Sequence, residues 1–202
     1  MTVVTETHLP LPLFQRGKVR DVYDLGDELL LVSTDRISVF DIVTPSGVPE
    51  KGRILNQMSA FWFHQTEGII GNHLISLVSD RAGLEKLSKR AGLTEVLPDY
   101  LIGRSMITRK AQRISVECVA RGYLSGSAWA EYRQRGTVQG QCMPVGLRES
   151  EQLPSPLFTP TTKSESEHDR PLTDADIKAM GIGAVMPALE NATMALYSHA
   201  SA

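Results

Sequence analysis

The sequence lacks the features that define several classes of protein. Its only cysteines, Cys118 and Cys142, form no Cys-x-x-Cys pair, which argues against zinc and disulfide frameworks. We interpret both as buried structural thiols of a reduced, cytoplasmic protein. No apolar run approaches the roughly 18 residues of a membrane span, and no apolar stretch follows a basic start as in a signal peptide. We therefore expect no membrane association.

Strong charge of one sign is also missing. The formal net charge is −2 and the pI is about 6.2, so the chain has no net positive field for wrapping duplex nucleic acid. Charged residues make up 22% and hydrophobic residues 42% of 202 residues, which excludes wholesale disorder. The length suits one large domain or two small ones.

Strand signals come first along the chain. Residues 19–25 and 28–33 flank Gly26-Asp27, a turn signal that predicts a hairpin. Residues 37–43 predict a third strand, closed by Pro45 and Gly47. Short strands with turn punctuation favour an antiparallel sheet over βαβ units.

Helix signals follow with further strands between them. Five apolar residues recur on one face of a helix that we expect from Gly52 to Gly68: Ile54, Leu55, Met58, Phe61 and Trp62. Further helices are expected over 80–92, 125–135 and 187–198, and further strands over 73–78, 104–112 and 114–121.

Residues 138–172 show neither helical nor strand periodicity. About thirty structureless residues are unusual within a compact domain. This segment is either a disordered linker or a loop held in place for function. Just after it, Thr173 and Asp176 form a weak capping pair for a helix.

Two short segments have the chemistry of anion sites. In the first, Gly17 allows close backbone approach, and Lys18 and Arg20 would project from one strand face. An ordinary solvated strand face is the alternative. In the second, Arg121 precedes a helix start at which Ser127 could help it bind a phosphomonoester. The alternative reading makes the serines simple helix caps.

A polar run within the aperiodic segment is a third candidate. It extends from Lys163 to Arg170 and includes His168 and Asp169. Such a run is usually a solvated surface, but mixed charge, a histidine and hydroxyls also suit ligand binding. No metal-binding spacing is present. The residues alone indicate a soluble α+β protein suited to a nucleotide or sugar phosphate, without selecting a reaction.

Five ordered motifs resemble the SAICAR synthetase family, whose members are phosphoribosylaminoimidazole-succinocarboxamide synthases. The motifs are GKVRDVY at 17–23, DRISVFD at 35–41, KG at 51–52, VECVARGY at 116–123, and Thr162-Lys163 through His168-Asp169. The resemblance covers residues from about 13 to 198. It implies an α+β, two-lobed fold: a kinase-like antiparallel ATP lobe over 1–112 and an incomplete α+β substrate lobe over 113–202.

The same resemblance implies an ATP-dependent ligase of purine biosynthesis. Such an enzyme joins L-aspartate to carboxyaminoimidazole ribonucleotide (CAIR), giving SAICAR, ADP and phosphate. Phosphorylation of the CAIR carboxylate would precede attack by the amine, and magnesium would bridge the ATP oxygens. We assign no catalytic residue and no metal ligand.

Motif matching assigns binding roles to ten residues. For ATP they are Gly17, Lys18 and Arg20 on the phosphate loop and Lys110 at the start of an inter-lobe link over 110–116. For CAIR they are Glu117, Arg121, Ser127, Lys163, His168 and Asp169. Asp35, Arg36 and Asp41 also match the family. We assign them no role in binding, and a turn-stabilising network is the alternative to such a role.

One departure from the family concerns the end of the chain. After the last helix, family members continue into Asp-Thr-Lys-x-Glu-Phe-Gly, an Asp-Glu pair and Asp-x-Ser-Arg, none of which follows the last expected helix in this sequence. We therefore expect a chain without the C-terminal third, whose activity is open. The alternatives are an inactive nucleotide-binding remnant and an interaction module covered by another chain, and a homo-oligomer also fits.

Overall fold

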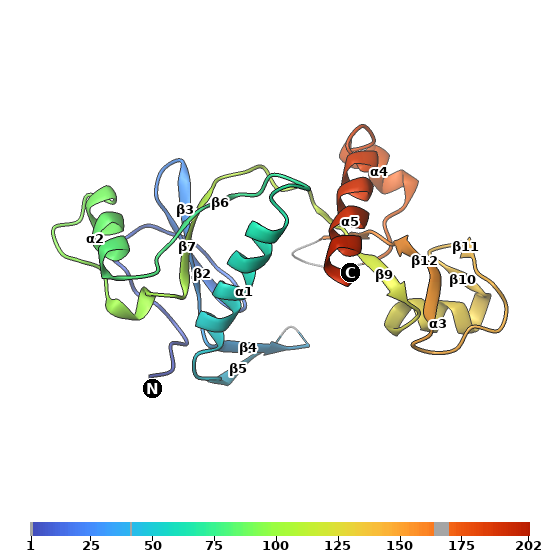
Figure 1. Ribbon diagram of the computed structural model, residues 1–202, viewed down its shortest axis with the longest axis horizontal. Coiled ribbons are helices and arrows are strands. Elements are labelled where there is room, and N and C mark those ends of the chain that lie inside the picture. The colour runs from blue at the N-terminus through green and yellow to red at the C-terminus, as the bar shows by residue number, and fades with distance from the viewer. Residues whose placement is uncertain (1, 41, 164–169) are drawn as a thin grey trace. The chain divides into compact units, whose positions relative to one another are not determined.

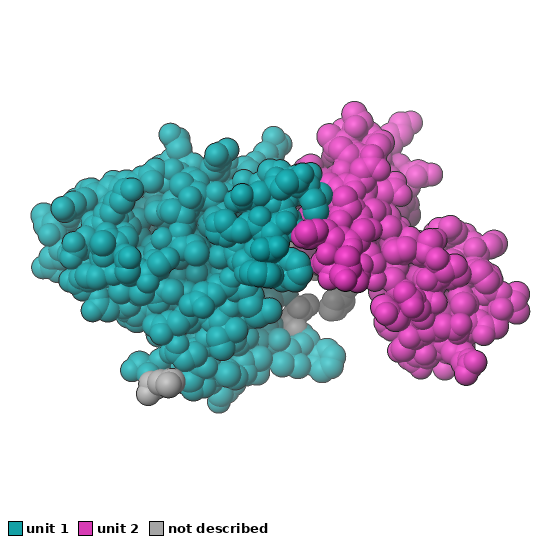
Figure 2. All heavy atoms as spheres, viewed as in Figure 1, with its two compact units in different colours: residues 1–112 teal, residues 113–202 magenta. Residues whose placement is uncertain are grey.

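The computed structural model describes residues 2–40, 42–163 and 170–202. The chain divides into two compact units, residues 1–112 and 113–202, which Figure 2 colours separately. Each unit is described by itself below. Among the helices of the described residues, none is both long enough and apolar enough to cross a membrane.

A five-stranded antiparallel sheet forms the framework of the first unit (Figure 1). In spatial order its strands are β1 (Leu13–Arg16), β2 (Arg20–Asp24), β3 (Glu28–Ser33), β7 (Ser105–Arg109) and β6 (Leu74–Leu77). The expected hairpin is confirmed: β2 pairs with β3, and Gly26 between them has a φ of 87°. Such a positive φ is accessible to glycine at little cost.

Side-chain alternation gives the sheet two different faces. Asp21, Tyr23, Leu30 and Val32 are buried on one of them. Helix α2 (Arg81–Arg90) packs there through Leu84 and Leu87, next to the short 3₁₀ helix Asp99–Leu101. The expected helix over 80–92 is thus confirmed, and the side chain of Asp80 caps it by accepting from the N–H of Gly83.

Helix α1 (Lys51–Gln65) packs on the opposite side of the sheet from α2 (Figure 1). It buries small and polar residues, namely Gly52, Asn56 and Ala60. The apolar face read from the sequence is exposed instead, at Ile54, Leu55, Met58, Phe61 and Trp62. The usual rule that the apolar stripe of a helix faces the core therefore fails here.

The expected single strand over 37–43 is wrong. The segment belongs to two antiparallel strands, β4 (Arg36–Val39) and β5 (Ile42–Gly47), with Val39 opposite Ile42. Phe40 has a φ of 48°, which a sequence pattern does not reveal. Pro45 lies inside β5 instead of ending a strand, because a two-stranded sheet has only edge strands, where proline is tolerated, and Gly47 is the last residue of β5.

The second unit combines three helices with three pairs of short antiparallel strands. The helices are α3 (Gly126–Arg135), α4 (Asp174–Met180) and α5 (Met186–Ser201). The pairs are β12 (Gln152–Phe158) with β9 (Ala120–Tyr123), β13 (Thr161–Thr162) with β8 (Val116–Glu117), and β10 (Thr137–Val138) with β11 (Gln141–Cys142). Its buried core consists of Leu124, Ala128, Val138 and Leu153.

Several expectations for the second unit need correction. Residues 138–172 are not structureless, because β11, β12 and β13 lie within them. The expected strand over 114–121 is divided into β8 and β9. Cys118 is partly exposed and Cys142 is exposed, so neither is a buried thiol. The capping pair is confirmed as a full capping box, in which Thr173 and Asp176 bond reciprocally.

Candidate functional site

A tight turn joins β1 to β2 and carries the first predicted anion site. The N–H of Gly17 donates to the carbonyl of Arg20 at 2.8 Å. Lys18 lies in the turn, and Arg20 is the first residue of β2. The expectation that Lys18 and Arg20 share one strand face is therefore wrong, because the strand begins only at Arg20.

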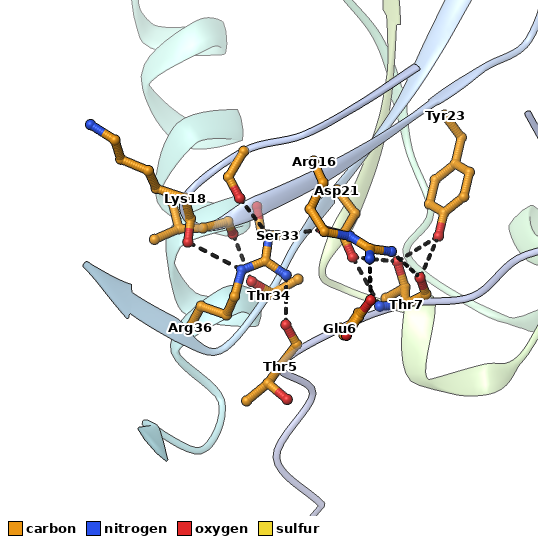
Figure 3. Close-up of polar contacts among 12 residues, drawn as sticks. Thr5, Glu6, Thr7, Arg16, Lys18, Asp21, Tyr23, Ser33, Thr34 and Arg36 are labelled. Carbon is orange, nitrogen blue, oxygen red and sulfur yellow. Dashed lines mark hydrogen bonds and ion pairs between the residues drawn. The ribbon is translucent and has the colours of Figure 1, made fainter. Parts of the chain in front are cut away.

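The buried side chain of Arg36 bonds to the backbone of this turn (Figure 3). Its guanidinium donates to the carbonyl of Gly17 at 2.8 Å and to the carbonyl of Lys18 at 3.1 Å. It also donates to Oδ1 of Asp21 at 2.8 Å. Burial opposes ionisation of Asp21, but the hydrogen bonds from Arg36 and Thr7 outweigh it and lower the pKa of the carboxyl.

Asp35 forms the second half of this network. It is fully buried and accepts from Arg104 Nη1 at 2.9 Å and from the N–H groups of Val4 and Gly52. Burial alone would raise the pKa of this carboxyl, yet these hydrogen bonds hold it below its ordinary value. Asp35 and Arg36 thus form a structural network, which is the alternative to a role in binding, while Asp41 lies outside the described residues.

A pocket of about 370 Å³ lies beside the turn. Its lining residues are Thr5, Glu6, Arg16, Gly17, Lys18, Arg36 and Val43. Two of the predicted ATP residues, Gly17 and Lys18, are thus brought together. The sequence analysis did not assign Arg16, which pairs with Glu6. Its place directly before Gly17 was the available signal.

The other two predicted ATP residues lie at opposite ends of β2. Arg20 begins the strand, and no ion pair or side-chain hydrogen bond engages it among the described residues. Burial of His73 lowers the pKa of its imidazole, and the positive charge of Arg20 lowers it further. Lys110 lies at the other end, where its ammonium bonds both carboxylate oxygens of Asp24 at 2.8 Å. This ion pair, led by the hydrogen bond from Lys110, lowers the pKa of Asp24.

Arg121 and Ser127 meet in the second unit, as the sequence predicts of an anion site. From β9, Arg121 donates through Nε to Thr159 Oγ1 at 3.0 Å and through Nη2 to Ser127 Oγ at 3.2 Å. Both partners are neutral hydroxyls. Among the described residues, no carboxylate lies within ion-pair distance of Arg121, so its positive charge is available to a ligand.

Helix α3 begins beside this arginine. Ser125 is its N-cap but makes no side-chain capping bond, and Ser127 lies in the first turn. The alternative that these serines merely cap the helix is therefore not supported. The first N–H groups of an α-helix have no partner within the helix, and they carry partial positive charge.

A pocket of about 150 Å³ opens next to Arg121 and Ser127. The remaining lining residues are Ala128, Glu131, Val138, Gln139, Thr161 and Pro171. Glu131 brings a carboxylate to this predicted anion site, but its oxygens accept from Gly140 N–H, Gln139 N–H and Thr137 Oγ1. Burial opposes ionisation of Glu131, yet these bonds lower its pKa. Sequence reasoning missed this group because most of it lies in the aperiodic segment.

Two more predicted residues of the CAIR site lie together. Lys163 Nζ donates to Glu117 Oε2 at 3.3 Å, and both side chains are nearly half exposed. This pair follows from the β8–β13 pairing, in which Glu117 lies opposite Thr161. His168 and Asp169 lie outside the described residues. Within the described part of the chain, no group of three or more His, Cys, Asp or Glu side chains could hold a metal ion.

A sequence model of the SAICAR synthetase family matches residues 13–202. The chain belongs to the SAICAR synthetase family. Two relatives named phosphoribosylaminoimidazole-succinocarboxamide synthase are 49% identical over 171 residues (Thermodesulfovibrio yellowstonii) and 45% identical over 203 residues (Geobacter sp. strain M21). They match 83% and 98% of the chain, which spans only 55% and 65% of their lengths.

Solved structures of the family share the fold. The SAICAR synthase of Saccharomyces cerevisiae, solved with SAICAR, has a TM-score of 0.81 at 37% identity. The match covers 96% of this chain and 64% of the yeast chain. A SAICAR synthetase solved with ADP has a TM-score of 0.68 at 19% identity, which supports the fold alone. The α+β fold expected from the SAICAR synthetase motifs is thus confirmed.

Proposed function

We propose that this chain carries the nucleotide and CAIR sites of a SAICAR synthetase and takes part in purine biosynthesis. The reaction joins the carboxylate of CAIR to the amine of L-aspartate at the expense of ATP. Family membership supports this reaction class, and the yeast relative is solved with the product SAICAR.

The observation that carries the proposal is the setting of Arg121. Among the described residues its guanidinium bonds to hydroxyls alone, it borders a pocket, and Ser127 places it beside the start of α3. An arginine fork with a helix N-terminus is well matched to a phosphomonoester. We assign the ribonucleotide phosphate of CAIR to this pocket. We place the carboxylate on its imidazole next to Glu117 and Lys163.

The first unit would bind ATP along β2. Arg20 and Asp24 are four residues apart, which corresponds to roughly 13 Å along a strand. We place the phosphates at the Gly17–Arg20 end and the adenine toward Lys110. Lys110 then acts through Asp24, which already neutralises its ammonium.

The reaction proceeds in two transfers. A carboxylate oxygen of CAIR attacks the γ-phosphorus of ATP, forming an acyl phosphate and releasing ADP. The aspartate amine then attacks the acyl carbon, and phosphate leaves as the C–N bond forms. Such chemistry depends on positioning and on neutralising phosphate charge. We assign charge neutralisation at the ATP phosphates to Arg20, and the positioning of CAIR through its ribonucleotide phosphate to Arg121.

Magnesium is proposed only as an ion carried on the triphosphate. When bound, it adds positive charge at the phosphate oxygens and usually keeps several waters. The described residues supply no cluster of ligands for it. We therefore assign no residue to the ion.

Incubation of the chain with ATP, CAIR and L-aspartate tests this proposal. The expected result is formation of SAICAR with equal amounts of ADP and phosphate. In parallel, calorimetry should detect binding of CAIR. An Arg121→Gln variant should weaken CAIR binding by about a hundredfold, since it loses charge-assisted hydrogen bonds.

Arg148→Gln is the matched control, because Arg148 is an exposed residue of the same unit that lies outside the pocket. It should bind CAIR like the unmodified chain. Binding of ATP and CAIR without turnover would support the alternative, a nucleotide-binding protein without ligase activity. Equal binding by both variants would contradict the assignment of Arg121.

A further inference from the structure

The N-terminal strap, residues 4–7, precedes residues 13–202, which the family model matches. It belongs to no helix or strand, yet Val4 and Thr7 are buried. Its backbone exchanges hydrogen bonds with Asp35: the N–H of Val4 donates to the carboxylate, and the N–H of Asp35 donates to the carbonyl of Val4. The strap is therefore a built part of the first unit.

Thr7 supplies the partners for one oxygen of Asp21. Its N–H and its hydroxyl donate to Oδ2 at 2.9 and 2.8 Å. Tyr23 Oη donates to the carbonyl of Thr7 at 2.8 Å and fixes the strap from the other side. Asp21 is fully buried, so the loss of these bonds would leave a buried carboxylate short of donors.

The other oxygen of Asp21 connects the strap to the turn. Oδ1 accepts from Arg36, whose guanidinium also donates to the carbonyl of Thr5 at 2.5 Å. The same guanidinium donates to the carbonyls of Gly17 and Lys18. Figure 3 shows this chain of contacts from Thr5 and Thr7 through Asp21 and Arg36 to the turn.

These contacts fix the direction of two peptide groups. The described residues include no cis peptide bond, and in a trans peptide the C=O and the next N–H point in opposite directions. Because the carbonyls of Gly17 and Lys18 point toward Arg36, the N–H groups of Lys18 and Val19 point away from it. The side chain of Lys18 also extends away from Arg36 (Figure 3). Successive N–H groups presented together favour an anion.

We infer that the N-terminal strap positions the Gly17–Arg20 turn for the phosphates of a nucleotide, acting through Thr7, Asp21 and Arg36. This inference rests on the proposed ATP site. Thr7 is a positioning residue, since it reaches the turn only through other side chains. Its effect is specific to phosphate, because the network ends on the peptide groups of the turn.

The test compares ATP with adenosine. In a Thr7→Val variant, the dissociation constant for ATP should rise about tenfold, the usual effect of losing a hydrogen bond to a charged group. Adenosine affinity should stay unchanged, because adenosine has no phosphate. Thr7→Ser keeps the hydroxyl and should restore ATP binding. Thr2→Val, at an exposed threonine just before the strap, is the matched control.

A second variant and a ligand-free readout keep the test decisive. Tyr23→Phe removes only the hydroxyl that holds Thr7 and should weaken ATP binding about threefold. NMR of the unliganded protein follows proton exchange at Arg36 Nε–H, which bonds to the carbonyl of Lys18. Exchange should be about tenfold faster in Thr7→Val, and unchanged in Thr2→Val.

Equal losses for ATP and adenosine, or no loss for either, would overturn the inference. Failure of the unmodified protein to bind ATP would instead overturn the proposed nucleotide site. In that case, faster exchange at Arg36 in Thr7→Val still supports positioning of the turn by the strap. Unchanged exchange overturns it.

Discussion

At the scale of single residues, one carboxylate joins three parts of the first unit. Asp35 accepts from Val4 in the strap, Gly52 in the first turn of α1, and Arg104 next to β7. Replacement by asparagine removes the charge and turns one acceptor into a donor. Since Arg104 is only 2% exposed, it would become a buried charge that keeps backbone carbonyl partners but has no carboxylate to pair with. We expect Asp35→Asn to destabilise the first unit by about 3–5 kcal/mol.

Denaturant unfolding can measure this effect within one unit. The chain has two tryptophans, Trp62 in the first unit and Trp129 in the second. A Trp129→Phe background therefore leaves a reporter of the first unit. Asp27→Asn, at an exposed turn residue, is the control and should change the free energy of unfolding by less than about 0.5 kcal/mol. A similarly small effect of Asp35→Asn would refute the three-part network.

Single residues also differ in whether their contacts could be predicted from the sequence. Arg121 and Ser127 are six residues apart and were paired correctly, because a strand end and a helix start are local signals. The partners of Asp35 and Arg36 could not be predicted. Arg104 lies 69 positions from Asp35, and Thr5 offers Arg36 a backbone carbonyl, which any residue could provide.

At the scale of elements, close packing of α1 against β3 depends on one glycine. A Cβ on Gly52 would lie 2.2 Å from the carbonyl oxygen of Ser33 and 2.8 Å from Arg104 Nη1. Neither neighbour is free to move, since Ser33 is in β3 and Arg104 is bonded to Asp35. We expect Gly52→Ala to cost about 1–3 kcal/mol through overpacking. The Trp62 reporter measures it.

Gly68→Ala and Gly71→Ala are the matched controls. A Cβ at either position meets nothing within 4 Å, and neither glycine has a positive φ. Both variants should therefore be as stable as the unmodified chain, or slightly more stable because alanine restricts the unfolded state. Destabilisation by the controls equal to that of Gly52→Ala would show that helix packing is not the cause.

Elements with strong local signals could be predicted, and the others could not. The β2–β3 hairpin has its turn glycine, and α2 and α4 have their capping residues. By contrast, β10, β11 and β13 are two residues long and exist only through pairing. Strand β12 could not be predicted because it contains Pro154 and Pro156. Among the described residues it pairs with β9 alone, so it is an edge strand, where proline is tolerated.

At the scale of the whole molecule, the ionisable groups with shifted pKa values divide unevenly. Of the described residues, the two carboxylates that are fully buried, Asp21 and Asp35, belong to the first unit, as does the partly buried His73. In the second unit, Asp176 has its pKa strongly lowered by Arg170 and Thr173, but its partners are exposed. Exposed pairs contribute little to stability. Acid should therefore affect the first unit more.

The pH dependence of that unit should show two regions. Burial, with the charge of Arg20, lowers the pKa of His73 below its ordinary 6.5, so the unfolded chain binds more protons than the folded one. Stability then rises with pH through this region and falls on acidification below about pH 6.5. Asp21 and Asp35 also have lowered pKa values, so their stabilisation is present above about 3.8 and is lost as pH falls further.

Two variants separate these regions. Unfolding is monitored through Trp62 in the Trp129→Phe background. His73→Gln should reduce the change in the free energy of unfolding between about pH 7.5 and 5.5, and it should leave the loss of stability below about pH 3.8 unchanged. Asp21→Asn should destabilise the first unit at neutral pH and reduce the further loss of stability below about pH 3.8. Trp129 fluorescence in a Trp62→Phe background is the control, since His73 and Asp21 make their contacts within the first unit. If His73→Gln left the dependence between about pH 7.5 and 5.5 unchanged, the histidine would not be its cause.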